Sequence, residues 1–140
     1  MEIAAQERPK NLRENIIIIE EAESTITGDN IVVEANIHDK KVTVVGFENH
    51  GGQTKAVSNP FGKVLVGHGN TFDSGFEGYM DAQTIATYIH GPLLPKNPDI
   101  ADEVILRGLK RRYTLDYLEP LQDSLEHAAH DAMLKRLNVK

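Results

Sequence analysis

The chain has no cysteine among its 140 residues, and this absence excludes several kinds of chemistry at once. Without thiols it can form neither disulfides nor thiolate metal sites, and it supplies no cysteine nucleophile of its own. A chain without disulfides is compatible with the cytoplasm, which is the location we expect.

Positive charge is scarce as well. The sequence holds 15 basic and 21 acidic residues, for a net charge of −6, and its only basic cluster is at residues 110–112. A nucleic-acid-binding surface needs a clustered excess of lysine and arginine. We therefore expect no nucleic-acid partner.

Long apolar runs are also missing. No stretch approaches the roughly 18 consecutive apolar residues that a membrane span needs, and the first residues lack the apolar core of a signal peptide. We expect no membrane span.

A chain of this length suits one domain. We expect a flexible arm at residues 1–14, which are polar and interrupted by Pro9, followed by a folded portion at residues 15–140.

Runs of β-branched residues predict the strands. Residues 15–19 consist of Asn15 and four consecutive isoleucines, and this apolar run suits a strand buried on both faces. Residues 31–37 and 41–47 are separated by a turn at residues 38–40, which favours an antiparallel hairpin. Residues 63–66 predict a further strand, and residues 84–89 predict a central one.

His90 follows that last run and precedes Gly91 and Pro92, which break regular strand pairing. A histidine at the end of a core strand can act as a base in a cleft, because histidine is the usual acid or base at neutral pH. The alternative is a hydrogen-bonded structural histidine. We expect its imidazole to face a cleft.

A helix is predicted after residue 97. Asn97 suits the N-cap and Pro98 the first helical position, and the apolar stripe would comprise Ile100, Val104, Ile105 and Leu109. A second helix is predicted to end near residue 136. Its packed face would include Leu121, Leu125, Ala128, Ala132 and Met133, with His127 and His130 on a solvated face.

Two motifs resemble a known family. Residues 86–98 have the sequence Ala-Thr-Tyr-Ile-His-Gly-Pro-Leu-Leu-Pro-Lys-Asn-Pro, and residues 46–54 have the sequence Gly-Phe-Glu-Asn-His-Gly-Gly-Gln-Thr. Within residues 31–111 the chain resembles the C-terminal half of cobyric-acid-synthase-like class I glutamine amidotransferases. The resemblance implies an α/β fold, namely a partial flavodoxin-like amidotransferase domain with a mixed sheet and C-terminal helices.

Within that family the motifs are most similar to the amidotransferase subunits of lipid II isoglutaminyl synthase complexes. The similarity implies that glutamine is the ammonia source, and that the ammonia goes to a Mur-ligase-like synthetase subunit that amidates the D-glutamate of the peptidoglycan stem. It also implies that ATP and Mg²⁺ serve at the synthetase partner and that this chain holds no cofactor.

By the same resemblance His90 corresponds to the histidine that activates the catalytic cysteine, although this chain contains no cysteine. Many class I members place an orienting carboxylate two residues beyond the histidine, where this sequence has Pro92. Asp73 and Glu77 are more distant candidates for that role. A complete class I domain is longer and carries its nucleophile in the N-terminal half, so we expect this chain to be a C-terminal portion.

The motif at residues 46–54 contains two consecutive glycines, which let the backbone approach a ligand or partner closely. One interpretation is a substrate or partner loop built from Glu48, His50, Gly52 and the later Asn70. The other is a hydrogen-bonded corner in which these side chains satisfy backbone groups. No metal site is expected.

Three functions remain open from the sequence. In the first, the chain is part of an amidotransferase whose cysteine is carried elsewhere, and that enzyme could also be of the cobyric-acid-synthase type. In the second, the chain is a non-catalytic partner-binding module derived from an amidotransferase. The third hypothesis, a metal hydrolase using His50, His68 and His90, lacks a compact metal-ligand spacing. A truncated sheet would leave residues 16–19 or the strand ending at Ile89 uncovered, so we also expect self-association.

Overall fold

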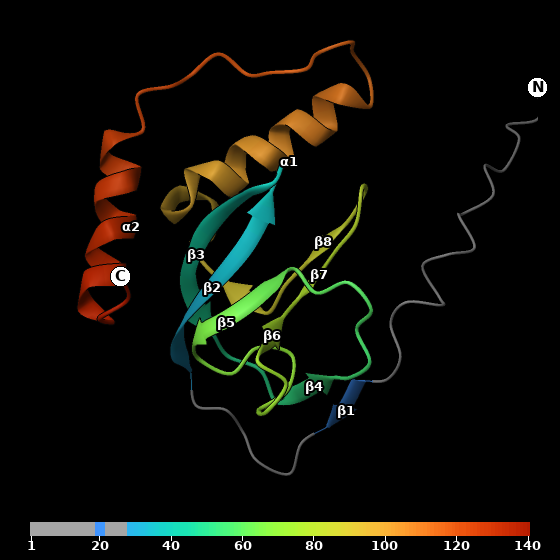
Figure 1. Cartoon of the computed structure of the whole chain (residues 1–140), viewed down its shortest axis with the longest axis vertical. Coiled ribbons are helices and arrows are strands. Elements are labelled where there is room, and N and C mark those ends of the chain that lie inside the picture. Colours follow the sequence, from blue (N-terminus) through green and yellow to red (C-terminus); the bar gives the residue numbers. More distant parts are fainter. Residues whose placement is uncertain (1–18, 22–27) are drawn as a thin grey trace, which may run out of the picture.

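The computed structural model describes residues 19–21 and 28–140, and its centre is a β-hairpin (Figure 1). Strand β2 (Asp29–Ile37) pairs antiparallel with β3 (Lys40–Glu48) along their whole length. The turn between them contains His38 and Asp39, whose φ angles are 50° and 62°. Two positive φ angles match the right-handed twist of the strands, so the turn is one residue shorter than predicted and Lys40 belongs to β3.

Three more strands extend the hairpin into a five-stranded sheet with the order β6-β5-β2-β3-β9. These are β5 (Gly62–Val66), β6 (Phe76–Glu77) and β9 (Ile89–His90), and every pairing in the sheet is antiparallel. Two small sheets stand apart from it. They pair β1 (Ile19–Glu21) with β4 (Gly52–Thr54), and β7 (Tyr79–Met80) with β8 (Ile85–Ala86).

Alternate residues of β2 and β3 form the hydrophobic core. Ile31, Val33 and Val44 are fully buried on one face, as the two-residue period of a strand places them, and Val32 and Val45 on the other face are fully buried as well. Phe61, Ile89 and Ile100 complete the same cluster. The predicted hairpin and the predicted strand at residues 63–66 are therefore confirmed.

The helices lie at one end of the sheet. A short 3₁₀ helix η2 (Leu94–Lys96) leads into α1 (Pro98–Lys110), and α2 (Ser124–Arg136) ends the chain. Figure 1 shows α1 near the turn of the hairpin and α2 beside β3. The sheet and its C-terminal helices confirm the predicted α/β class. No helix among the described residues is long and apolar enough to cross a membrane.

Several details differ from the sequence-based predictions. The strand expected at residues 84–89 is two short strands in different sheets, and β9 lies at the edge of its sheet rather than at its centre. The break falls at Thr87 and Tyr88, where the Tyr88 N–H donates to the Glu77 carboxylate and the Ile89 N–H to the Thr87 hydroxyl. A side chain from another strand thus interrupts the ladder.

The packing of α1 also differs. Val104 and Ile105 are exposed, while the charged Glu103 is buried. Burial is possible because Glu103 binds Arg107 and the His38 imidazole at the hairpin turn. Buried charges need such partners, and these contacts join α1 to the hairpin.

Helix α2 forms its hydrogen bond to the sheet through a histidine. Leu121 lies before the helix, and both Leu121 and Leu125 are highly exposed. His130, which was predicted to be solvated, is buried. Its Nδ1 donates to the Lys96 carbonyl oxygen, and its Nε2 lies 2.8 Å from the Thr43 hydroxyl.

The predicted arm at residues 1–14 and the self-associating run at residues 16–18 lie outside the described residues. Ile19 lies in β1, where it pairs with Thr54. The self-association itself stays a prediction.

Asn97 fixes the start of α1 to the sheet, though not as predicted. It occupies the N-cap position without a side-chain cap bond. Instead its amide pairs with both backbone groups of Val45, at 2.7 and 2.8 Å, and donates to the Leu93 carbonyl oxygen at 2.6 Å.

We therefore predict that Asn97→Ala lowers the free energy of unfolding by about 2–4 kcal/mol, because it leaves buried backbone groups without partners. Urea denaturation measures the loss. The exposed Asn36→Ala is the matched control and should change stability by less than about 0.5 kcal/mol. Equal effects of the two substitutions would show that the Asn97 contacts contribute little.

Candidate functional site

Glu48, the last residue of β3, is fully buried. Its carboxylate accepts the backbone N–H of His68 at 2.6 Å and that of Gly69 at 2.9 Å. The loop comes this close because residue 67 is glycine: its φ is +102°, and an added Cβ would lie 2.6 Å from a Glu48 oxygen. Glu48 therefore holds the glycine-rich loop against the end of β3.

His50 lies beside Glu48. Its Nδ1 donates to the Gly52 carbonyl oxygen at 2.7 Å, and its Nε2 is 3.4 Å from the Glu48 carboxylate. The ring stacks on Tyr88 with a centroid distance of 3.8 Å and an interplanar angle of 11°. The Tyr88 hydroxyl in turn lies 2.7 Å from the Thr54 hydroxyl. His50 thus joins the motif at residues 46–54 to the segment before His90.

Asn70 clamps the backbone at Gly78. Its amide donates to the Gly78 carbonyl oxygen at 2.9 Å and accepts the Gly78 N–H at 2.7 Å. The side chain is buried, so both bonds are shielded from water. This clamp fixes the residue that follows Glu77.

Glu77 is the second fully buried carboxylate. Its Oε1 accepts the Thr87 hydroxyl at 2.5 Å and the Tyr88 N–H at 2.7 Å, whereas Oε2 has no hydrogen-bond partner among the described residues. Burial raises the pKa of the Glu77 carboxyl, and the nearby charge of Glu48 adds to the rise, while the bonds from Thr87 and Tyr88 act against it.

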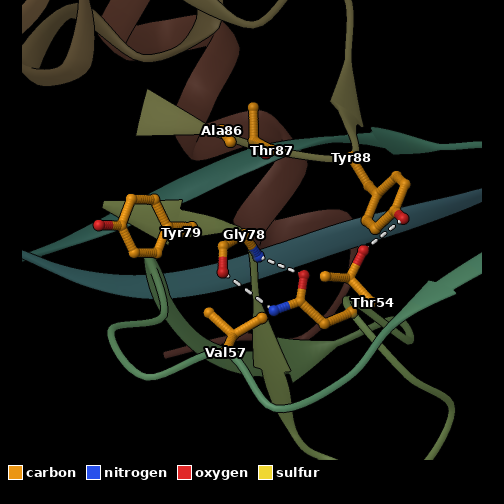
Figure 2. A pocket seen from close by; sticks show the side chains of 8 residues that line it. Thr54, Val57, Gly78, Tyr79, Ala86, Thr87 and Tyr88 are labelled. Carbon is orange, nitrogen blue, oxygen red and sulfur yellow. Dashed lines mark hydrogen bonds between the residues drawn. The ribbon is translucent and has the colours of Figure 1, made fainter. Parts of the chain in front are cut away.

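A cavity of about 210 Å³ lies between these elements (Figure 2). The Thr54–Tyr88 and Asn70–Gly78 hydrogen bonds lie along its wall. Its lining combines these residues with apolar neighbours from β7, β8 and the loop after β4, namely Thr54, Val57, Asn70, Gly78, Tyr79, Ala86, Thr87 and Tyr88.

The structure brings Glu48, His50, Gly52 and Asn70 together, as the hypothesis of one loop cluster requires, and hydrogen bonds satisfy each of them. His90 lies apart from this cluster. It is exposed at the end of β9, paired across the strands with Phe47, and its imidazole forms no hydrogen bond or ion pair with residues 28–140.

The remaining candidates can be placed as well. Asp73 is exposed and accepts the Thr71 hydroxyl. His68 contributes its backbone to Glu48, and its ring meets the edge of Phe72. No group of three metal-ligating side chains occurs in the described part of the chain, so the metal hydrolase hypothesis gains no support there.

The sequence offers Glu77 as a candidate carboxylate for orienting His90, but it does not predict the contacts of Thr87 and Tyr88 with that carboxylate. Only tertiary contact shows that the Glu77 carboxylate reaches across to residues 87 and 88. Thr87 and Tyr88 were assigned to a strand because of their β propensity.

We predict that Glu77→Gln gains stability relative to the wild type as the pH rises. Folding raises the Glu77 pKa, so ionising this carboxyl costs more free energy in the folded state than in the unfolded state. The wild type therefore loses stability as the pH rises from the ordinary carboxyl pKa to the raised pKa of the folded protein. Glutamine stays neutral. Urea unfolding between about pH 4 and about pH 7 should show a widening difference in favour of the variant.

The exposed Glu119→Gln serves as the control, and its difference from the wild type should stay nearly constant over that pH range. A constant or shrinking difference for Glu77→Gln would contradict a raised pKa.

Comparison with known proteins assigns these motifs to a family. Residues 13–98 match the CobB/CobQ-like glutamine amidotransferase domain. The chain is 35% identical over 113 residues to the lipid II isoglutaminyl synthase (glutamine-hydrolyzing) subunit GatD of Staphylococcus aureus (strain N315), which covers 81% of this chain and 45% of that protein. It is 30% identical over 103 residues to the subunit of the same name from Streptococcus pneumoniae (strain ATCC BAA-255 / R6), covering 71% of this chain and 40% of that protein.

The chain thus spans less than half the length of these two relatives. The family match includes Glu48, His50, Gly52, Asn70 and His90, and it confirms the resemblance drawn from the two motifs. The chain belongs to the CobB/CobQ-like glutamine amidotransferase domain family.

Proposed function

We propose that this chain is the histidine-bearing part of a glutamine amidotransferase that releases ammonia for the amidation of the D-glutamate in the peptidoglycan stem of lipid II. The observation that carries the proposal is the similarity to two lipid II isoglutaminyl synthase subunits over most of the chain. His90 acts as the base, and the cysteine nucleophile comes from a part of the enzyme outside this sequence.

The position of His90 supports this division. The residue is exposed at the end of β9, and β9 is an edge strand in the described sheet. An edge strand offers unpaired backbone groups to which another strand can add. A cysteine-bearing element that packs along this edge would lie next to His90.

In this reaction His90 accepts one proton and later returns it. Its imidazole takes the proton of the cysteine thiol, and the thiolate forms a bond to the carbonyl carbon of the glutamine side chain. The imidazolium then returns the proton to the leaving nitrogen as the carbon–nitrogen bond breaks and ammonia departs. Water cleaves the resulting thioester to glutamate, and backbone N–H groups stabilise each oxyanion.

The ammonia is consumed by a Mur-ligase-like synthetase subunit, which uses ATP and Mg²⁺ to activate the acceptor carboxylate. This chain itself needs no cofactor for its part of the reaction. A cytoplasmic location fits this assignment, because the glutamine and ATP that the complex uses are cytoplasmic metabolites.

A second candidate function is a non-catalytic module that keeps the partner-binding surface of an amidotransferase. Two observations favour it: the chain has no cysteine, and the described residues give the His90 imidazole no hydrogen-bond partner that would orient it. Activity of a reconstituted enzyme separates the two functions.

We predict that the purified chain releases no ammonia from glutamine, because no side chain in it replaces the thiolate. None of its serines, Ser24, Ser58, Ser74 and Ser124, lies in a Gly-x-Ser-x-Gly elbow. Activity should appear when the chain is combined with the cysteine-bearing polypeptide. His90→Ala should then lower the rate of ammonia release by about 10²–10⁴-fold, the usual contribution of a general base.

His90→Ala should change the free energy of unfolding by less than about 1 kcal/mol, because an exposed side chain packs against little. His127→Ala, an exposed histidine on α2, is the matched control and should keep full activity. An active complex that is insensitive to His90→Ala would refute the role of His90, and a complex that never becomes active would favour the non-catalytic module.

A further inference from the structure

We infer that Glu77 is a positioning residue for His90, acting through Thr87 and Tyr88. The inference deepens the proposed function and rests on it, since it concerns how the proposed base is held. No part of it requires Glu77 to touch the substrate.

One carboxylate oxygen organises three consecutive residues. Glu77 Oε1 accepts the Thr87 hydroxyl at 2.5 Å and the Tyr88 N–H at 2.7 Å. The Thr87 hydroxyl oxygen also accepts the Ile89 N–H at 3.0 Å. The relay therefore ends at the residue directly before His90.

These bonds replace strand pairing at this point. β8 ends at Ala86 and β9 begins at Ile89, so residues 87 and 88 belong to neither sheet. Without the two side chains, the N–H groups of Tyr88 and Ile89 would have no partner beside a buried region, which would destabilise this path of the chain. The carboxylate thus determines the path that the chain follows into β9.

Glu77 is itself held firmly. It pairs with Gly62 in the sheet, and Asn70 clamps the next residue, Gly78, through two hydrogen bonds. Gly78 has a φ of +62°, and an added Cβ would lie 2.4 Å from the Ala86 carbonyl oxygen. Only glycine allows residues 78 and 86 to approach this closely, so Glu77 meets Thr87 from a fixed position.

The side chain of Tyr88 is held from the other direction. His50 stacks on its ring, and the Thr54 hydroxyl lies 2.7 Å from its hydroxyl. Backbone and side chain of the segment before His90 are therefore both fixed. Such support matters because a displacement of about 1 Å in a catalytic group can lower a rate about 100-fold.

The first test uses the isolated chain and needs no activity. Amide hydrogen exchange, followed by NMR, should speed up at Tyr88 and Ile89 in Glu77→Ala. Thr87→Val should speed up Ile89 in particular, because it removes that amide's acceptor. Glu77→Gln keeps one accepting oxygen and Thr87→Ser keeps the hydroxyl, so both variants should stay close to the wild type. The buried hairpin amides of Val33 and Val44 serve as internal controls.

If Glu77→Ala does not fold, Thr87→Val still tests the relay, since it leaves the second Glu77 bond in place. Unchanged exchange at Ile89 in Thr87→Val, with the hairpin intact, would overturn the inference.

The second test uses the complex with the cysteine-bearing polypeptide. Glu77→Ala and Thr87→Val should lower kcat for ammonia release by about 10–100-fold, as is usual when the support of a functional group is removed, with KM for glutamine within about twofold. Glu77→Gln and Thr87→Ser should recover most of kcat. A purely structural role would lower the amount of active enzyme without this pattern of rescue.

The same variants distinguish an error in the proposed role of His90 from an error in the positioning role of Glu77. If His90→Ala has no effect on ammonia release, the proposed function is wrong whatever Glu77 does. If His90→Ala abolishes release while Glu77→Ala and Thr87→Val leave kcat unchanged, the role of His90 stands and the positioning role of Glu77 is wrong.

Discussion

The buried carboxylate of Glu48 is the constraint on which the rest of the structure depends. A carboxylate taken out of water is costly unless hydrogen-bond donors surround it, and here the donors are backbone groups of His68 and Gly69. Meeting that need brings the glycine-rich loop to the end of β3. The same loop delivers Asn70 to Gly78, and Gly78 sets the position of Glu77, the second buried carboxylate.

The two carboxylates bind different parts of the chain. Glu48 lies across the strands from Ile89 and holds the loop, while Glu77 holds Thr87 and Tyr88 directly. Hydrogen bonds within a buried region favour one arrangement of the groups that they join, and among the described residues only Glu77 Oε2 in this network is left without a partner. The residues directly before the exposed His90 are therefore held in place by hydrogen bonds. This suits the proposed function, in which the cysteine nucleophile approaches His90 from outside this chain.

The sequence predicts those parts of the fold that local pattern determines. The hairpin follows from alternating β-branched residues around 31–47, and the start of α1 follows from Pro98 and its acidic first turn. It does not predict the break between β8 and β9, because that break depends on a carboxylate ten residues earlier in the chain. For the same reason it misplaces His130, whose burial depends on Thr43 in a distant strand. It offers Glu77 as a carboxylate for His90, but not the contacts with Thr87 and Tyr88 that connect the two.

The most direct test of this account is a double-mutant cycle between Glu48→Gln and Glu77→Gln, measured by urea unfolding at about pH 7. If the two carboxylates belong to one network, their effects on the free energy of unfolding are not independent, and the coupling should be at least about 0.5 kcal/mol. Effects that add to within about 0.3 kcal/mol would contradict the account.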